Sequence, residues 1–351
     1  ITAHEADHPV PDAAGLQGSE QIIRLLQSAG EKDLIIFLIS GGGSALLPSP
    51  VPGLTLNDLQ KTTQTLLEVG ANIEEMNALR KHLSRLKGGR LAKLAYPATL
   101  ISLILSDVIG DNLGSIASGP TAPDESSFHT CMRIIDKFDI GKKIPQQVLD
   151  FFVSGQNGNE EETVKSGNPV FKQIQNVIIG SSIQALKEAK RVAETLGYNS
   201  LILSSSIEGE AKEVAKMFAS IAKEIISTKN PLSPPACVIS GGETTVTIKG
   251  HGMGGRNQEF ALAAAVEIDG LDNTLILSCG TDGTDGPTDA SGAIVDGQTL
   301  NRAKQKQMDA DKYLSDNNSY TFFKALDDLI FTGPTFTNVM DLRLIMVTEK
   351  T

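Results

Sequence analysis

The feature that most constrains the fold of this chain is an apolar strand that runs directly into a turn of small residues. The pattern occurs at residues 38–44 (LISGGGS), 177–182 (VIIGSS), 238–244 (VISGGET) and 277–283 (LSCGTDG). The irregular spacing argues against a solenoid repeat. The pattern instead predicts strands that deliver backbone-rich loops to the carboxyl edge of a sheet, where α/β proteins bind their ligands.

Amphipathic segments separate these strands, and glycines end several of them. Helices are predicted over residues 57–70, 72–89, 183–197, 209–227 and 256–268, and further strands over 33–40, 97–107, 198–206 and 244–249. This alternation predicts mainly parallel sheets with crossover helices. The 351 residues suffice for two domains. A polar stretch at 154–168 predicts a linker, so we expect one α/β domain over 1–165 and a second over 166–351.

The composition excludes several classes of protein. A net charge of −11 argues against a nucleic-acid surface, and no run of 18 apolar residues offers a membrane span. Three widely separated cysteines form no CxxC pair and no disulfide framework, which fits a reducing compartment. The stretch HEADH matches the HExxH zinc motif, but Pro9 disfavours the helix that would place His4 and His8 on one face.

The first glycine-rich loop consists of Ser40, Gly41, Gly42, Gly43 and Ser44. The backbone N–H groups of such a loop are suited to surrounding an anion. The loop matches neither the dinucleotide fingerprint nor the P-loop, which needs Gly-Lys-Ser/Thr. A tight turn without a ligand explains the loop alone equally well, so both interpretations stay open.

A second loop, GHGMGG at 250–255, matches the pattern GxGxxG between a predicted strand and a predicted helix. A nucleotide-binding loop requires this context. Arg256 follows the glycines at the first helical turn, where a guanidinium suits a phosphate or carboxylate better than a nicotinamide ring. A flexible loop with a solvated arginine is the alternative, and the strand–glycine–helix order favours a phosphate site.

Basic residues crowd the segment 79–92. If one helix continues through it, Arg80, Ser84 and Lys87 share a face. A solvated charged face is the usual meaning of such a run. Because the chain as a whole is acidic, a basic cluster near glycine-rich loops is also suited to attracting anionic substrates.

Aspartates gather in two loops, at Asp107 and Asp111 after a predicted strand and at Asp282, Asp285 and Asp289 among glycines. A calcium-binding EF-hand is disfavoured because the twelfth position from Asp282 is Ala293 rather than Glu. Mg²⁺ held by one or two carboxylates and substrate phosphates needs no such cage. Turn formation explains any single aspartate equally well.

Eight motifs in order along nearly the whole chain resemble the class II glycerate kinases, the glycerate 2-kinases that end in a MOFRL domain, here about 236–348. They are HPVPD, SGGGSALL, ANIEEMNALRKHLSRLKGGRLA, LILSDVIGDNLGSIASGPT, GGETTV, GMGGRNQEFAL, GTDGTDGPTDASGA and TGPTFTNVMDL. HPVPD then looks like an extended loop of that family, near its active site, rather than part of a zinc helix.

The resemblance implies ATP- and Mg²⁺-dependent phosphorylation of D-glycerate at its 2-hydroxyl, by a Rossmann-like parallel-sheet domain and a second α/β domain with the site in the cleft between them. Arg256 is then expected to stabilise the transferring phosphoryl group. Asp107 is expected to orient or deprotonate the hydroxyl, or to bind Mg²⁺ with Asp111. The residues expected to bind substrate and phosphate groups are Ser40, Gly41, Gly42, Gly43, Ser44, Arg80, Lys87, Gly254, Gly255, Asn257 and Asp282.

In one respect the chain departs from the family it resembles. Family members begin upstream with a strand–Gly–Lys segment whose lysine looks catalytic, and loss of such a charge-stabilising group costs about 10² to 10³ in rate. Two alternative functions stay open. GHGMGG suggests an NAD(P)-dependent hydroxypyruvate reductase, and the missing segment suggests a truncated, non-catalytic paralogue that binds ligand. The expected compartment is the cytoplasm, with the mitochondrion open because the chain does not begin with Met. The sequence leaves the oligomeric state open.

Overall fold

The computed structural model describes residues 2–349. The chain divides into an N-terminal unit, residues 1–106 and 111–179, and a C-terminal unit, residues 107–110 and 180–351. The division falls later than the predicted linker at 154–168, because strand β3 (Ile174–Gly180) completes the sheet of the N-terminal unit. No helix in the described part of the chain is long and apolar enough to cross a membrane.

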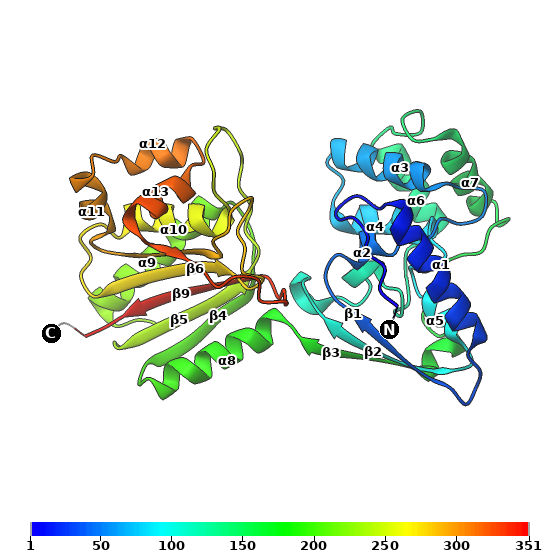
Figure 1. Ribbon diagram of the computed structural model, residues 1–351, viewed down its shortest axis with the longest axis horizontal. Coiled ribbons are helices and arrows are strands. Elements are labelled where there is room, and N and C mark those ends of the chain that lie inside the picture. The colour runs from blue at the N-terminus through cyan, green and yellow to red at the C-terminus, as the bar shows by residue number, and fades with distance from the viewer. Residues whose placement is uncertain (1, 350–351) are drawn as a thin grey trace. The chain divides into compact units, whose positions relative to one another are not determined.

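The N-terminal unit is built on a three-stranded sheet in the order β1 (Leu34–Ile39), β2 (Thr99–Leu105) and β3, with β1 and β2 parallel (Figure 1). On one face, Ile35 and Phe37 pack into a core with residues of helices α1 (Ala13–Ser28) and α5 (Arg90–Ala95). On the other face, Leu34, Ile36 and Leu38 are 58%, 60% and 70% exposed. The strand predicted over 33–40 is thus present, but its continuous apolar run is buried on one face only.

The other helices of this unit include those of a second apolar core. They are α2 (Gly43–Leu46), α3 (Leu56–Glu68), α4 (Ile73–His82), α6 (Phe128–Lys137) and α7 (Gln146–Gln156), with short 3-10 turns η1 (Ile109–Asp111), η2 (Ile116–Ser118) and η3 (Pro169–Gln173). The core itself comes from α3, α4, α6 and α7. Upstream, the stretch HPVPD is not helical, and its last residue, Asp12, caps α1 by accepting the Gly15 N–H at 2.8 Å.

The predicted helix 72–89 ends early, at His82. The hydroxyl of Ser84 then accepts the backbone N–H groups of Leu86 and Lys87 at 3.2 and 3.3 Å, which stabilises a turn in place of the helix. Gly88 and Gly89 follow with φ of 58° and 77°, a left-handed conformation that glycine adopts without strain. The expectation that Arg80, Ser84 and Lys87 share one helical face is therefore wrong.

The C-terminal unit contains a six-stranded mixed sheet in the order β4-β5-β9-β6-β7-β8 (Figure 1). The strands are β4 (Asn199–Ile207), β5 (Ala236–Gly242), β6 (Thr274–Gly280), β7 (Gly292–Asp296), β8 (Leu329–Ile330) and β9 (Asp341–Val347). β4 and β5 are parallel, but β9 runs antiparallel to both β5 and β6. The prediction of mainly parallel sheets is thus wrong for this unit, because the last strand returns between two earlier ones.

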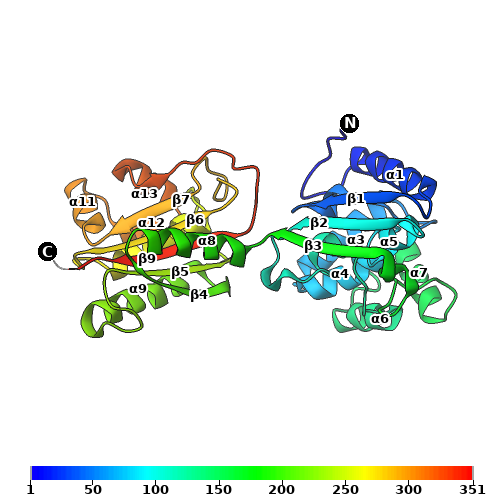
Figure 2. The ribbon, with the colours of Figure 1, turned by 90° about the horizontal axis from the view of Figure 1, so that it is seen from below.

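Helices cover both faces of this sheet (Figure 2). They are α8 (Ser182–Thr195), α9 (Ala211–Thr228), α10 (Arg256–Glu267), α11 (Thr299–Gln305), α12 (Ala310–Ser315) and α13 (Ser319–Leu326). Val238 points to the core with α9, α10 and α13, whereas its neighbours Cys237 and Ile239 point to the core with α8. The predicted strand 244–249 is absent, and the segment makes only one bridge, from Thr245 to Glu210.

Candidate active site

The loop of residues 40–44 follows β1 and leaves its backbone donors open. Among the residues that the structure describes, the N–H groups of Gly41, Gly42, Gly43 and Ser44 donate to no protein acceptor. The Ser44 hydroxyl hydrogen-bonds the hydroxyl of Ser118 on η2, and Ser118 donates to the side-chain oxygen of Asn77 on α4 at 3.0 Å. These contacts fix the loop beside α4, and its free donors favour the anion-binding interpretation over a plain turn.

Two cations, Lys87 and Arg80, lie near each other in this unit, and Lys87 contacts the end of the short helix that follows the loop. The Lys87 ammonium is fully buried and donates to the backbone oxygen of Leu47, at the end of α2, at 3.0 Å. Burial, followed by the charge of Arg80, lowers the pKa of Lys87 to about 7. Burial also lowers the pKa of Arg80. The turn after α4 therefore brings together the two residues that a continuous helix was expected to align.

These two cations have no carboxylate partner among the described residues. Within residues 2–349, neither Arg80 nor Lys87 makes an ion pair, and Arg80 makes no side-chain hydrogen bond. Nearby bases are neutralised: Lys81 pairs with Asp124, Arg85 with Glu20 and Lys93 with Glu161. A buried charge without a partner is unfavourable, so the pair is suited to an anionic ligand.

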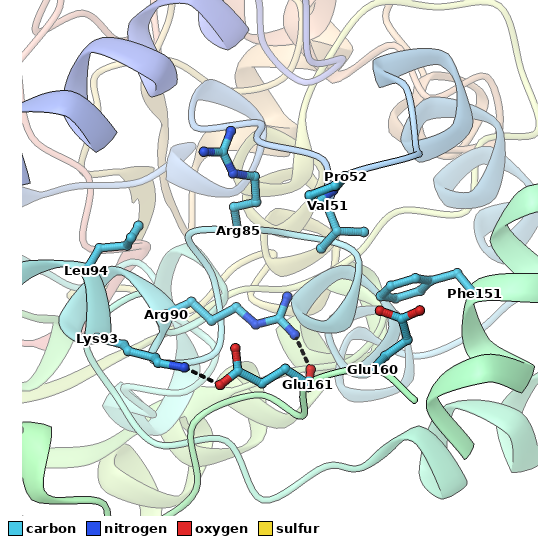
Figure 3. A pocket seen from close by; sticks show the side chains of 9 residues that line it. All are labelled: Val51, Pro52, Arg85, Arg90, Lys93, Leu94, Phe151, Glu160 and Glu161. Carbon is cyan, nitrogen blue, oxygen red and sulfur yellow. Dashed lines mark hydrogen bonds and ion pairs between the residues drawn. The ribbon is translucent and has the colours of Figure 1, made fainter. Parts of the chain in front are cut away.

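A separate cavity of about 420 Å³ in the same unit is less suited to an anion (Figure 3). Three of its lining residues, Arg85, Arg90 and Lys93, are basic, but all are engaged by the protein. The Arg90 guanidinium donates to the backbone oxygens of Ser84 and Glu161, both at 2.7 Å, and Lys93 reaches the Glu161 carboxylate. Each of these three basic side chains is thus already bound by the protein, and the Glu160 carboxylate at the wall further disfavours an anion.

In the C-terminal unit, Arg256 begins α10 and binds two carboxylates. Its Nε and Nη2 atoms each lie 2.9 Å from an oxygen of Asp341, and its Nη1 atom lies 2.7 Å from Glu243. The Asp341 side chain is completely buried and also accepts Arg343 Nη2 at 2.8 Å. Burial lowers the pKa of Arg256, but hydrogen bonding and charge from Asp341 outweigh it, so the pKa is raised. Arg256 is thus firmly held, and only its Nη1 faces a half-exposed partner.

Asp107 lies near this cluster. Residues 107–110 group with the C-terminal unit. The pKa of Glu243 is raised by burial, and the charges of Asp341 and Asp107 raise it further. Two carboxylates that disfavour each other's ionisation form a place where a cation is stabilised. The oxygen donors of Asp107 and Glu243 fit Mg²⁺, which takes one or two carboxylates. Asp111 is grouped with the other unit, and the described residues hold no cluster of three or more candidate metal ligands.

The GHGMGG loop is packed shut rather than open. A Cβ atom on Gly250 would overlap Asp316, and one on Gly255 would overlap Asp285. The Asp285 carboxylate accepts the backbone N–H groups of Asn257 and Gln258 at 3.1 and 2.9 Å, which occupies the N-terminus of α10. An internal carboxylate thus takes the place that a phosphate needs. The geometry favours a packing role for this motif. The same holds for Gly254, Gly255 and Asn257, which were predicted to bind substrate or phosphate.

The three aspartates of the 280–293 loop have different roles. Asp285 caps α10, and Asp289 accepts the Tyr320 hydroxyl at 2.7 Å. Asp282 is partly exposed and accepts only the N–H of Thr284, at 3.0 Å, through its side chain. Among the three, Asp282 is therefore the one available to a ligand.

The structure also brings together a Cys–His–Glu group that the sequence analysis missed. The ring of His82 lies 3.4 Å from the Cys131 sulfur through Nδ1 and 2.9 Å from Glu162 through Nε2. His82 Nδ1 is also 2.8 Å from the backbone oxygen of Ala78, so it serves as a donor there. Cys131 is completely buried, and burial raises its pKa well above the usual value. The group resembles a triad in its contacts but lacks an accessible thiolate.

Comparison with known proteins places this geometry in context. Residues 1–153 match the family model described as a domain of unknown function, DUF4147, and residues 236–341 match the MOFRL family. Glycerate 2-kinase of Pyrococcus horikoshii is 45% identical over 351 residues, which cover 100% of this chain and 79% of that protein. The crystal structure of glycerate kinase from Thermotoga maritima aligns with a TM-score of 0.91 at 42% identity, over 98% of this chain and 80% of that one. A protein of Agrobacterium vitis with the provisional name hydroxypyruvate reductase is 42% identical over 345 residues, 98% of this chain and 87% of that protein.

Proposed function

The chain belongs to the glycerate kinase family with a C-terminal MOFRL domain, and on that premise we propose that it is a glycerate 2-kinase. It transfers the γ-phosphate of ATP to the 2-hydroxyl of D-glycerate and yields 2-phosphoglycerate and ADP. The observation that carries this proposal is the 45% identity to a glycerate 2-kinase along 351 residues. The unpaired cations Arg80 and Lys87 support it, since both substrates are anions.

In the N-terminal unit, Arg80, Lys87 and the N–H groups of residues 41–44 bind an anionic group, either the glycerate carboxylate or a phosphate. Phosphoryl transfer depends mainly on positioning and on neutralising charge. Open backbone donors and two desolvated cations supply both, because electrostatic interactions are stronger where water is excluded. Lys87 must be protonated to act in this way.

In the C-terminal unit, Asp107 orients or deprotonates the substrate hydroxyl, and Asp107 and Glu243 are the residues that would hold Mg²⁺. When bound, Mg²⁺ neutralises charge on phosphate oxygens. Arg256 is positioned by the buried Asp341, and its Nη1, which also contacts the half-exposed Glu243, is the donor for a phosphoryl oxygen. Asp282, in the loop after β6, offers a further, partly exposed carboxylate.

The test is a coupled assay of this chain with ATP, Mg²⁺ and D-glycerate, which detects 2-phosphoglycerate through enolase. Product that depends on both ATP and D-glycerate supports the kinase. The same assay on a version extended by the upstream segment of a relative determines whether the lysine expected there is required. If neither version forms product but ADP still binds, the non-catalytic rival is favoured instead.

The hydroxypyruvate reductase alternative has one observation in its favour, the name of the Agrobacterium vitis relative. The geometry of the GHGMGG loop opposes it, since Asp285 occupies the helix N-terminus that a dinucleotide pyrophosphate would need. We expect no oxidation of NADH or NADPH with hydroxypyruvate. Oxidation at a rate above that of the kinase reaction would overturn the proposal.

A further inference from the structure

Phe336 is the most exposed large apolar side chain of the described residues. It lies in the segment between β8 and β9, and it is 97% exposed. Its φ of 58° falls in the left-handed region, which a bulky residue rarely adopts and which strains the backbone. Because the ring is exposed to water, no burial of apolar surface offsets this strain. The free protein therefore offers no reason of its own for this conformation.

The backbone that carries Phe336 is firmly anchored, so the ring is not at the tip of a loose loop. Thr335 donates from its backbone N–H to the oxygen of Asp282 at 3.1 Å and from its hydroxyl to the oxygen of Thr281 at 2.5 Å. Val339 donates its N–H to the hydroxyl of Thr281 at 2.9 Å. These bonds on both sides of Phe336 hold the aromatic ring outward in a defined place.

That place is the ligand-binding edge of the C-terminal sheet. Asp341, where the Phe336 segment enters β9, pairs in register with Gly242 at the end of β5 and with Gly280 at the end of β6. The same Asp341 holds Arg256. The exposed ring is thus carried by a segment that leads directly into the arginine and carboxylate cluster proposed for phosphoryl transfer.

We infer that Phe336 is the stacking platform for the purine base of the donor nucleotide. The inference rests on the proposed function, because it takes the nucleotide as a substrate. A flat aromatic ring binds any base through its face, and such stacking is largely independent of the hydrogen-bonding pattern of the base. The inference assigns the base of the nucleotide to the C-terminal unit, and it predicts similar affinities for ADP and GDP.

The chain contains no tryptophan, so Phe336→Trp introduces a single fluorescent reporter. We expect ADP to quench its emission and inorganic tripolyphosphate, which lacks a base, to leave it unchanged. Phe331→Trp is the matched control, because Phe331 lies in the same segment, is 57% exposed and is not assigned to the base. The inference is overturned if ADP quenches the emission of both variants equally. It is also overturned if ADP does not quench the emission of Phe336→Trp.

Affinity provides an independent measurement. By calorimetry, we expect Phe336→Ala to raise the Kd for ADP roughly 5- to 100-fold, Phe336→Tyr to change it little, and neither to alter binding of tripolyphosphate. An unchanged Kd in Phe336→Ala, while the wild-type chain forms 2-phosphoglycerate, overturns the inference alone. A wild-type chain that neither forms product nor binds ADP overturns the proposed function as well.

Discussion

Arg256 and Asp341 lie 85 positions apart in the sequence, yet the guanidinium of one meets the carboxylate of the other at 2.9 Å through two nitrogens. Asp341 is completely buried, and it is also the carboxylate of the buried Arg343. The single carboxylate of Asp341 thus forms ion pairs with two arginine side chains at the edge of the sheet. The other carboxylate bound to Arg256, Glu243, is half-exposed and contributes less to keeping the arginine in place.

Asp341→Asn is expected to destabilise the protein by about 3–5 kcal/mol, because it leaves the buried guanidinium of Arg343 without its carboxylate and removes the buried partner of Arg256. The midpoint of urea denaturation measures the change. Asp289→Asn is the matched control: it weakens a single hydrogen bond, from the Tyr320 hydroxyl, for about 1 kcal/mol. Equal losses in the two variants would contradict the central role of Asp341.

Lys87→Met is expected to weaken anion binding yet stabilise the ligand-free protein at neutral pH by about 1–3 kcal/mol, since it removes a buried charge without a carboxylate partner. The pKa of Lys87 is about 7, below its usual value, so its burial is most unfavourable at pH below 7 and less so as the pH rises. Thermal melting and calorimetry with 2-phosphoglycerate measure the two effects. In the wild type, affinity for the anion should fall as the pH rises above 7. An affinity independent of pH from 6 to 9 would remove Lys87 from the site.

Glu243→Gln is expected to raise the Mg²⁺ concentration required for half-maximal kinase activity at least about tenfold, because one of two proposed carboxylate ligands is lost. Folding should be preserved, as Asp341 still holds Arg256. The measurement is a Mg²⁺ titration of the coupled assay. Glu213→Gln, which removes a surface carboxylate paired with Lys216, is the control and should leave the titration unchanged. An unaltered Mg²⁺ requirement in Glu243→Gln would exclude this residue as a ligand.

Glu162 is expected to make the stability of the protein sensitive to acid. Burial raises the pKa of Glu162, but hydrogen bonds from His82, the Phe128 N–H and Lys165 outweigh it and lower the pKa to about 2. A carboxyl group with a depressed pKa stabilises the folded state above its usual pKa of 4.5 and loses this effect as the pH falls toward 2. Urea denaturation between pH 5 and pH 2.5 should therefore show a shallower loss of stability in Glu162→Gln than in the wild type. Parallel curves would show that Glu162 is not the group responsible.

Strands and most helices could be predicted from the sequence because each carries its signal locally. The runs at 97–107 and 198–206 form β2 and β4, and the periodic segments at 183–197 and 209–227 form α8 and α9. The segment 72–89 was misleading, since its apolar spacing continues past His82 while Ser84 and two glycines stabilise a turn. Apolar periodicity reports which side chains are buried, and it does so whether the backbone is helical or turns back.

The candidate site was only partly predictable, because its decisive contacts join distant segments. Arg80 and Lys87 could be selected as basic residues, but that they lack carboxylate partners becomes visible only once the partners of Lys81, Arg85 and Lys93 are known. Glu243 was missed, although it directly follows two glycines at the end of a strand. The His82 group has no sequence signal, as its members are 49 and 80 positions apart.

The close packing of the GHGMGG glycines limits what this motif can say about the function of a related protein. Every glycine of the motif contacts the protein so closely that a larger residue would overlap its neighbours. Selection for folding alone would then maintain the glycine spacing through evolution, whatever reaction a descendant catalyses. In this chain the GxGxxG string is thus explained by packing, and by itself it does not indicate whether a protein is a kinase or a reductase.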